Sequence, residues 1–593
     1  MKIVLTLSLL LLAPFGVPRA EVPVMPFDEV RSGMKGTGRT VFSGTEIESF
    51  DVEILGKLPN VGPDQNLILA RCSGGPLAQT GVLAGMSGSP VTIDGKLVGA
   101  VAYSWGFTKD AIAGITPIEE MLAIPARDAE SPARISARSL VDEDLEALRS
   151  PAGLAEFFAG QLHRLVQRSP APLRASIPLS ISGMSPEAIL GALPGLPDAG
   201  FVPLQAGGGS TDPSPSPPLE PGSALGLKLV RGDIEIAASG TVTWVEGDGV
   251  LAFGHPLFGL GSIDLPLTGA SVQALIPSLR QSAKIATPLS EIGALRQDRA
   301  TGVFGRTGVR PRMIPVRMQL NSSTSGARTF SFDVADDPLL SPLLLYASLN
   351  GILSSRERTF GSASLRLREG SVIKMLDEDD VRLDNLFSGS SAFNYGTGIS
   401  AYVLYLLMNN TWSTPRIAGV NLIFEYDERP QTATILRASL DRYRVHPGDT
   451  VVASVVARPY RGPDQVFARE IVIPPHTPPG RLSLFVSGAA AASQAETREE
   501  RLLPQDLNQL IRLINQLRRN DQIFILASGE DAGVLLGGAR LPSLPPSVNS
   551  VLSRPRSRGN FSIVNRRLVL EEVIDTDFLM EGAKRLVLEV EER

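Results

Sequence analysis

The sequence predicts a mainly-β protein of several domains. Its 593 residues exceed what a single hydrophobic core usually supports, so we expect about three to five domains. Gly and Pro are plentiful, at 57 and 46 residues, and they bound short runs rich in Val, Ile and Thr. Such a pattern is typical of many short strands joined by turns.

The first twenty residues have the pattern of a signal peptide. Lys2 gives a short positive start, residues 3–12 form an apolar run, and a stretch with Pro and Gly ends at Ala20. The apolar run is too short to span a bilayer as a helix, and no later segment predicts a membrane span. We therefore expect cleavage after Ala20 and export to the periplasm or the extracellular space. An uncleaved N-terminal anchor is the alternative.

Residues 26–125 predict a compact β module. PVTIDGKLVGAVAY is a hairpin signal, because Asp94 and Gly95 suit the positive φ angles of a type I′ turn. Asp94 is therefore interpreted as a turn residue rather than a catalytic acid. The apolar period then changes in AIAGITPIEEML, for which we expect a helix capped by Thr116 with Pro117 in its first turn.

Residues 126–223 differ from their neighbours. Apolar residues recur at helical spacing in SLVDEDLEALRSPAGLAEFFAGQLHRLVQR, which predicts a helical insert. Residues 205–223 are rich in Pro, Gly and Ser and cannot bury a core, so we expect a flexible connector or a long surface loop there. The sequence favours neither a regulatory insert nor a simple tether.

The second half of the chain returns to β character. Residues 224–360 predict a second β module, whose hairpin GTVTWVEGDGVLAFGHPL turns at Asp248. Residues 361–490 contain alternating runs typical of a β-sandwich-like domain. Residues 491–593 open with a helical pattern and close with strands, which predicts a C-terminal α+β domain.

Charge and composition exclude several classes of function. Acidic and basic residues are mixed along the chain and sum to a net charge of −6, so no basic block predicts a nucleic-acid partner. The single cysteine, Cys72, can form no internal disulfide, and no Cys/His cluster has zinc spacing. We therefore expect no metal and no organic cofactor. Cys72 is predicted to be a small buried apolar residue.

The segment GMSGSP at residues 85–90 has the features of a nucleophile loop. Glycines beside a serine permit a sharp turn and let backbone N–H groups approach a substrate carbonyl. The pattern Gly-x-Ser-Gly-x-Pro resembles the nucleophile loop of trypsin-like peptidases. The resemblance implies Ser87 as the nucleophile and the N–H groups of Gly85 and Ser87 as oxyanion donors. The alternative is a glycine-rich turn that happens to contain serines.

The general base has few candidates, because the chain has only four histidines: His163, His255, His446 and His476. His255 follows an apolar strand and precedes a proline, so we expect it at a strand end. A neutral imidazole there can accept the serine proton and return it to the leaving amine. A histidine with a purely structural role is the alternative at this position.

Longer stretches resemble the SpoIVB peptidase family, which is placed with the trypsin-like double-β-barrel peptidases. The resemblance covers residues 80–122 around the serine and GTVTWVEGDGVLAFGHP around His255, and extends to residues 33–56 and 295–306. It implies a trypsin-like double β-barrel core. It also implies a serine endopeptidase acting on peptide bonds of exported or envelope proteins.

Three departures from the family pattern matter. Ser87 precedes His255, so the half-sites are in swapped order, which predicts a circularly permuted pair of barrels. No PDZ domain is evident. The position that matches the family's acid holds no carboxylate, so Asp298 is the favoured orienting acid, ahead of Asp264 or a Ser-His dyad without an acid. A catalytically inactive peptidase-fold scaffold or protein-binding protein of the cell envelope is the second predicted function.

Overall fold

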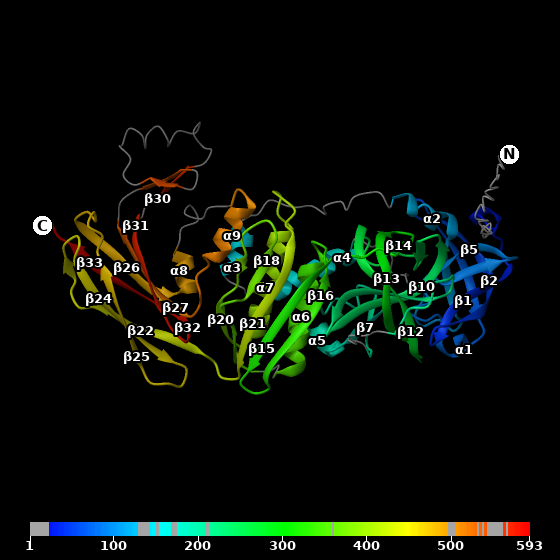
Figure 1. The fold of residues 1–593 in the computed structure, drawn as a ribbon, viewed down its shortest axis with the longest axis horizontal. Coiled ribbons are helices and arrows are strands. Elements are labelled where there is room, and N and C mark those ends of the chain that lie inside the picture. Colours follow the sequence, from blue (N-terminus) through cyan, green and yellow to red (C-terminus); the bar gives the residue numbers. More distant parts are fainter. Residues whose placement is uncertain are drawn as a thin grey trace, which may run out of the picture.

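The protein is mainly β, as the sequence predicts, and is elongated, with the N-terminal strands at one end and the C-terminal strands at the other (Figure 1). The computed structural model describes residues 23–127, 142–149, 153–167, 175–207, 214–357, 361–495, 504–529, 533–536, 539–541, 561–564 and 567–592. The expected signal peptide lies outside these residues. None of the helices in the described ranges is both long and apolar enough to cross a bilayer.

The N-terminal module is a closed six-stranded barrel. Its strands pair in the order β1-β2-β3-β6-β5-β4, and the ring closes where β1 pairs with β4. The bounds are β1 (Lys35–Ser43), β2 (Glu46–Gly62), β3 (Gln65–Ser73), β4 (Pro90–Ile93), β5 (Lys96–Ser104) and β6 (Ile112–Pro117). Helix α1 (Leu77–Thr80) follows β3, and α2 (Ile118–Leu122) follows β6.

Two predictions made from local sequence in this barrel are confirmed, the hairpin at Asp94 and the buried position of Cys72. Asp94 and Gly95 join β4 to β5 with φ angles of 50° and 75°, which confirms the hairpin. Cys72 is buried in the barrel core, and burial raises the pKa of its thiol to about 12. The prediction of an inert apolar role for Cys72 is therefore confirmed.

A second six-stranded ring lies within a larger sheet. Its strands pair in the order β9-β12-β13-β14-β11-β10, and the ring closes because β10 also pairs with β9. The bounds are β9 (Ala224–Gly232), β10 (Glu235–Glu246), β11 (Gly249–Ala252), β12 (Gly261–Ile276), β13 (Ala283–Arg299) and β14 (Gly302–Thr307). Counted along the chain, both rings have the same strand order, 1-2-3-6-5-4.

The region between the barrels contains strands as well as helices. Its elements are α3 (Asp142–Arg149), α4 (Leu154–Gln167), β7 (Ile177–Ser182), α5 (Pro186–Ala192) and β8 (Phe201–Gln205). Strand β7 pairs with β10, so this region extends the sheet of the second barrel. Residues 214–223 form a surface loop, in which Ser216 Oγ donates to the Ser290 carbonyl and accepts from the Gly269 N–H. Of the two forms expected for the Pro-rich stretch, the surface loop therefore holds for residues 214–223.

The large sheet continues well past residue 360. Strand β15 pairs in parallel with β21, although two buried helices lie between these strands in the sequence. The elements are β15 (Met313–Ser322), β16 (Gly326–Ala335), α6 (Leu340–Arg356), β17 (Ala363–Leu367), β18 (Val372–Met375), β19 (Val381–Arg382), β20 (Asn385–Gly389), α7 (Ala392–Met408) and β21 (Ile417–Asp427). The boundary expected at residue 360 thus falls inside one sheet.

Two further sheets share one core at the C-terminal end. The first has the order β25-β24-β22-β32 and the second β23-β33-β26-β27-β31. The bounds are β22 (Thr432–Leu440), β23 (Arg444–Val445), β24 (Thr450–Pro459), β25 (Gln465–Val472), β26 (Gly480–Gly488), β27 (Gln522–Gly529), β31 (Arg567–Asp575), β32 (Leu579–Glu581) and β33 (Ala583–Val590). Strands from both sides of residue 490 therefore build the same core.

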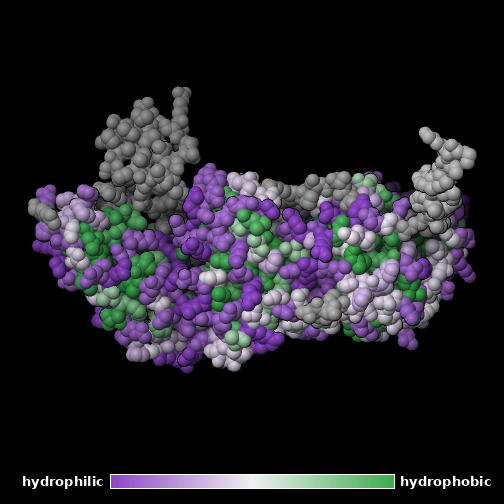
Figure 2. All heavy atoms as spheres, in the orientation of Figure 1, coloured by the Kyte–Doolittle hydropathy of each residue, from purple (hydrophilic) through white to green (hydrophobic). Residues whose placement is uncertain are grey.

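The remaining described elements are short. They are the 3-10 helices η1 (Phe27–Glu29) and η2 (Pro125–Arg127), the helices α8 (Ala489–Ala495) and α9 (Leu507–Asn515), and the strands β28 (Gly533–Leu536), β29 (Ala539–Leu541) and β30 (Phe561–Val564). Polar and hydrophobic side chains are interspersed over the face of the molecule seen in Figure 2. The residues predicted to be catalytic are not on this surface, because Ser87 and His255 have no exposed area.

Candidate active site

Ser87 and His255 lie in equivalent connections of the two barrels. Ser87 is between the third and fourth strands of the first barrel, β3 and β4. His255 is between the third and fourth strands of the second barrel, β11 and β12. The two predicted half-sites therefore have the same topological position, one in each barrel.

The nucleophile loop, residues 85–89, is bound to strand β10 of the second barrel. The N–H of Thr241 donates to the Ser87 carbonyl over 2.8 Å. The hydroxyl of Thr241 donates to the Gly85 carbonyl over 2.9 Å, and that of Thr243 donates to the Gly88 carbonyl over 2.8 Å. The two threonines thus draw the carbonyls of the loop toward β10.

Gly88 brings this loop close to the histidine segment. Its φ angle is 98°, and a Cβ added there would lie 1.8 Å from the Thr241 carbonyl oxygen and 2.6 Å from the Phe253 nitrogen. Only glycine permits such an approach of one backbone to another. The structure therefore brings Ser87 and His255 onto contacting backbone segments, although they are far apart in the sequence.

In the nucleophile loop every carbonyl of residues 85–88 accepts a hydrogen bond, but two N–H groups donate none to the described residues. The fourth loop carbonyl, of Met86, accepts from both the N–H and the Oγ of Ser89, at 2.9 and 2.6 Å. By contrast, the N–H groups of Gly85 and Ser87 donate to no group in the described part of the chain. Leaving a buried donor unpaired costs about 1–3 kcal/mol, so two of them in one loop indicate a site for an anionic or strongly polar oxygen.

The backbone ahead of His255 is strained. Phe253 and Gly254 both have a φ angle of 69°, and a bulky residue at positive φ is a rare outlier. The Phe253 ring meets the imidazole edge-on, with ring centroids 5.8 Å apart. The Thr116 hydroxyl donates to the Gly254 carbonyl over 2.7 Å. The expectation that Thr116 caps α2 is wrong, since its hydroxyl is used to hold the histidine segment instead.

The hydrogen bond at Nδ1 fixes the tautomer of neutral His255. Nδ1 lies 2.8 Å from the carbonyl oxygen of Pro256. Because a carbonyl only accepts, Nδ1 carries the proton and Nε2 carries the lone pair. Nε2 is the nitrogen that a general base needs. Ser87 Oγ has no hydrogen-bond partner among the described residues, so the Ser87–His255 hydrogen bond is not formed in this structure.

Asp298 binds the loop that follows His255. Its carboxylate accepts from four successive N–H groups at 2.7, 2.8, 2.8 and 3.3 Å, those of Leu257, Phe258, Gly259 and Leu260. Burial raises the pKa of this carboxyl group, while the four donors oppose the rise. Asp298 thus binds the backbone that directly follows Pro256, whose carbonyl is bound to the imidazole. The other candidate, Asp264, accepts from Arg296 over 3.1 Å.

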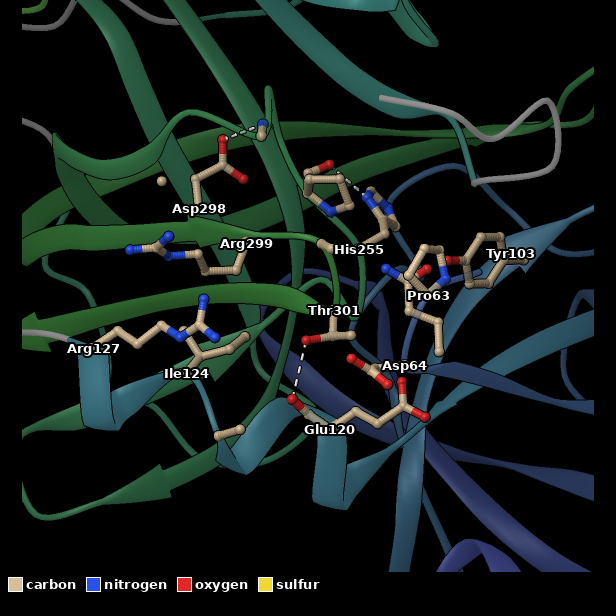
Figure 3. A pocket seen from close by; sticks show the side chains of 16 residues that line it. Pro63, Asp64, Tyr103, Glu120, Ile124, Arg127, His255, Asp298, Arg299 and Thr301 are labelled. Carbon is tan, nitrogen blue, oxygen red and sulfur yellow. Dashed lines mark hydrogen bonds between the residues drawn. The ribbon is translucent and has the colours of Figure 1, made fainter. Parts of the chain in front are cut away.

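A pocket of about 560 Å³ opens beside His255, between the two barrels (Figure 3). Asp64, Tyr103 and Glu120 line it from the side of the first barrel, and Arg299 lines it from the second. Burial raises the pKa of the Glu120 carboxyl group, although Asn66 donates to it. The pocket gives a polar, partly charged approach to the imidazole.

No group of three or more His, Cys, Asp or Glu side chains that could hold a metal ion is present in the ranges that the structure describes. The three supporting threonines, Thr116, Thr241 and Thr243, carry no sequence signal of their own. Hydroxyl side chains are ordinary in strands, and only the contact between the barrels gives these three a role.

Comparison with known proteins bears on the first barrel. The family model of SpoIVB peptidase S55 matches residues 17–122, which include all six strands of that barrel and the nucleophile loop. This segment, which is less than half of the chain, is similar to the SpoIVB peptidase S55 family. The resemblance stated from the sequence is therefore confirmed over these residues, and it indicates a peptidase that acts on proteins. No curated protein and no solved structure matches the chain.

Proposed function

We propose that the protein is a serine endopeptidase with Ser87 as its nucleophile and His255 as its general base. One observation carries the proposal: all four carbonyls of the buried segment 85–88 are bound, while two of its N–H groups remain available beside the Ser87 hydroxyl. The family match over the same loop supports it.

The proposed reaction follows the usual order of steps for a serine peptidase. Ser87 Oγ attacks the peptide carbonyl while its proton passes to Nε2 of His255, and the carbonyl oxygen becomes an oxyanion bound by the N–H groups of Gly85 and Ser87. The imidazolium then protonates the leaving amine as the C–N bond breaks. Water hydrolyses the acyl-enzyme by the same steps. The Pro256 carbonyl keeps the imidazole oriented throughout.

The His255→Ala variant tests this assignment of the base. We expect it to reduce cleavage of a mixed peptide library by about four orders of magnitude, because the serine loses its proton acceptor. His476→Ala is the matched control, since His476 is an exposed histidine in a loop of the C-terminal sheets. A His255→Ala protein that cleaves the library at the wild-type rate would contradict the proposal.

We infer that Asp298 is a positioning residue for the histidine loop. Asp298→Asn leaves one acceptor oxygen for four N–H groups, so the loop that carries Pro256 should loosen and misplace the imidazole. A displacement of this kind costs about a hundredfold in kcat/KM. Asp264→Asn, which alters an ion pair elsewhere in the same barrel, should change kcat/KM by less than about threefold. Wild-type kcat/KM in Asp298→Asn would rule out this role.

The site must open for a peptide to reach it. Ser87 and His255 have no exposed area, and a Cβ on Gly85 would lie 3.2 Å from Pro178 at the start of β7. The Ala175 N–H also donates to the Ala102 carbonyl of β5 over 2.9 Å. We propose that the pocket beside His255 is the entrance and that this start of β7 moves when substrate binds.

We further propose that the substrate is an exported or envelope protein and that the enzyme acts in the periplasm or outside the cell. The signal-peptide pattern of residues 1–20 supports this location. Cell fractionation tests it: the mature protein should begin at Glu21 and be absent from the cytoplasm.

One observation favours a second function, a catalytically inactive scaffold of the same fold. It is the absence of a hydrogen bond on Ser87 Oγ within the described residues. Catalytic hydrogen bonds are often unformed without substrate, so we prefer the peptidase. A fluorophosphonate reagent separates the two functions, because only a competent serine reacts with it.

A further inference from the structure

Lys284 is a buried lysine on β13 that lies against the nucleophile loop. Its side chain has almost no exposed area, and its N–H donates to the Ala84 carbonyl over 3.1 Å. A Cβ on Gly85 would lie 3.4 Å from Lys284 Cδ. Among the residues that the structure describes, Lys284 Nζ is bound to the Thr40 hydroxyl rather than to a carboxylate. A buried ammonium without an ion pair is costly, so its presence here calls for a reason.

A chain of hydrogen bonds leads from this ammonium to the proposed oxyanion donors. Lys284 Nζ donates to Thr40 Oγ1 over 2.7 Å. Thr40 Oγ1 lies 3.4 Å from Thr241 Oγ1, which donates to the Gly85 carbonyl over 2.9 Å. Since an ammonium only donates and a carbonyl only accepts, each hydroxyl receives a proton from one side and gives one to the other. The direction of the whole chain is therefore fixed.

The chain ends on one particular peptide group. The Gly85 carbonyl belongs to the peptide between Gly85 and Met86. The two available N–H groups, of Gly85 and Ser87, belong to the peptides on either side of it. Holding the central peptide in one orientation therefore constrains both donors.

The charge of Lys284 changes near neutral pH. Burial lowers the pKa of the amine to about 7, and the carboxylate of Glu48 opposes this shift, so the donating ammonium form predominates below that pH. The ammonium also lies 5.5 Å from the centroid of the Phe42 ring, a favourable cation–π distance. A charged donor makes stronger hydrogen bonds than a neutral one.

We propose that Lys284 is a positioning residue for the oxyanion site, which it holds in place through Thr40 and Thr241. Lys284 touches neither the substrate nor the reacting atoms in this role. It keeps the Gly85–Met86 peptide from turning, so that the flanking N–H groups remain available to the transition state. The inference rests on the proposed peptidase function and deepens it.

Steady-state kinetics of the full chain test the inference. Lys284→Met removes the donor and keeps the length of the side chain. We expect kcat to fall about ten- to a hundredfold with KM changed less than about twofold, because the donors are displaced and substrate binding is left intact. Affinity for a peptide boronic acid, whose adduct carries the oxyanion, should fall by the same factor as kcat. A residue with only a structural role would not give this pairing.

Two further variants keep the test decisive if Lys284→Met is poorly folded. Thr40→Val breaks the same chain and leaves the ammonium in place, so it should reproduce the selective loss of kcat. Thr268→Val is its matched control, because Thr268 is a buried threonine of the same barrel as Lys284 whose hydroxyl has no partner among the described residues. It should leave kcat within about twofold, as expected for a site outside such networks.

The loss of a buried lysine as such is controlled by Lys228→Met. Lys228 is also buried in the second barrel, but it pairs with Glu235 over 2.7 Å. This variant should lower stability and leave kcat per folded molecule unchanged. Wild-type kcat in both Lys284→Met and Thr40→Val would overturn the inference, provided that Ser87→Ala is inactive. Hydrolysis that survives Ser87→Ala would instead overturn the proposed function.

Discussion

Replacement of Ser87 by alanine is expected to reduce hydrolysis of a mixed peptide library to background, a loss of at least about four orders of magnitude in kcat. In the proposed mechanism the serine supplies the atom that forms the acyl-enzyme, and no other hydroxyl of the nucleophile loop can replace it. Ser89 Oγ is already bound to the Met86 carbonyl at 2.6 Å. Mass spectrometry of the cleaved library measures the loss whatever the cleavage specificity of the enzyme.

The control for this prediction is Ser239→Ala. Ser239 is a buried serine on β10 whose hydroxyl also has no partner in the described ranges. Its removal should leave the cleavage rate within about twofold of the wild type, as for most substitutions outside a site. Equal losses in both variants would point to a general folding defect, and cleavage that survives Ser87→Ala would exclude Ser87 as the nucleophile.

The second large effect is expected from Gly88→Ala. The added Cβ would meet the Thr241 carbonyl oxygen at 1.8 Å at a φ angle of 98°, so the nucleophile loop would have to separate from β10. Backbone strain and overpacking together should cost about 2–5 kcal/mol of stability, and activity should be lost. Urea unfolding measures the first effect and library cleavage the second.

Gly95→Ala separates conformational strain from the loss of this contact. Gly95 also has a positive φ angle, 75°, but a Cβ there has nothing within 4 Å. It should cost only about 1–2 kcal/mol and leave activity intact. If Gly88→Ala were no worse than Gly95→Ala, the close contact between the two barrels at Gly88 would be disproved.

The swapped order of serine and histidine has a simple explanation in the fold. Both barrels have the strand order 1-2-3-6-5-4, and both residues occupy the connection from the third to the fourth strand. Because the two barrels have the same topology, the connection from the third to the fourth strand is equivalent in both. The serine can therefore lie in either barrel and the histidine in the other, and the two connections still face each other. Catalytic sites depend on geometry rather than chain order.

Local sequence signals were sufficient for the fold class, the Asp94-Gly95 hairpin and the glycine-rich turn around Ser87. Each depends on residues that are neighbours in the chain, such as the glycines around Ser87. The hydrogen bonds from Thr241 and Thr243 to the nucleophile loop could not be predicted, because they form only when the two barrels pack together. The four backbone hydrogen bonds of Asp298 are of the same kind. They form only once the loop after His255 has folded around the carboxylate.

Helical spacing likewise described only part of the region between the barrels. This spacing predicted the helices of the region but not strand β7. That strand is a short run that contains a proline, and it pairs with a distant strand, β10. The start of this strand covers the nucleophile loop through Pro178. Residues near Pro178 are therefore the natural place to look for control of access to the site.

Peptide mapping after reaction with a fluorophosphonate tests the central claim most directly. The full-length wild-type protein should acquire one adduct, on Ser87, and His255→Ala should acquire none. Cleavage of the peptide library by a protein in which Ser87 stays unmodified, or an adduct on another serine that abolishes that cleavage, would contradict the account.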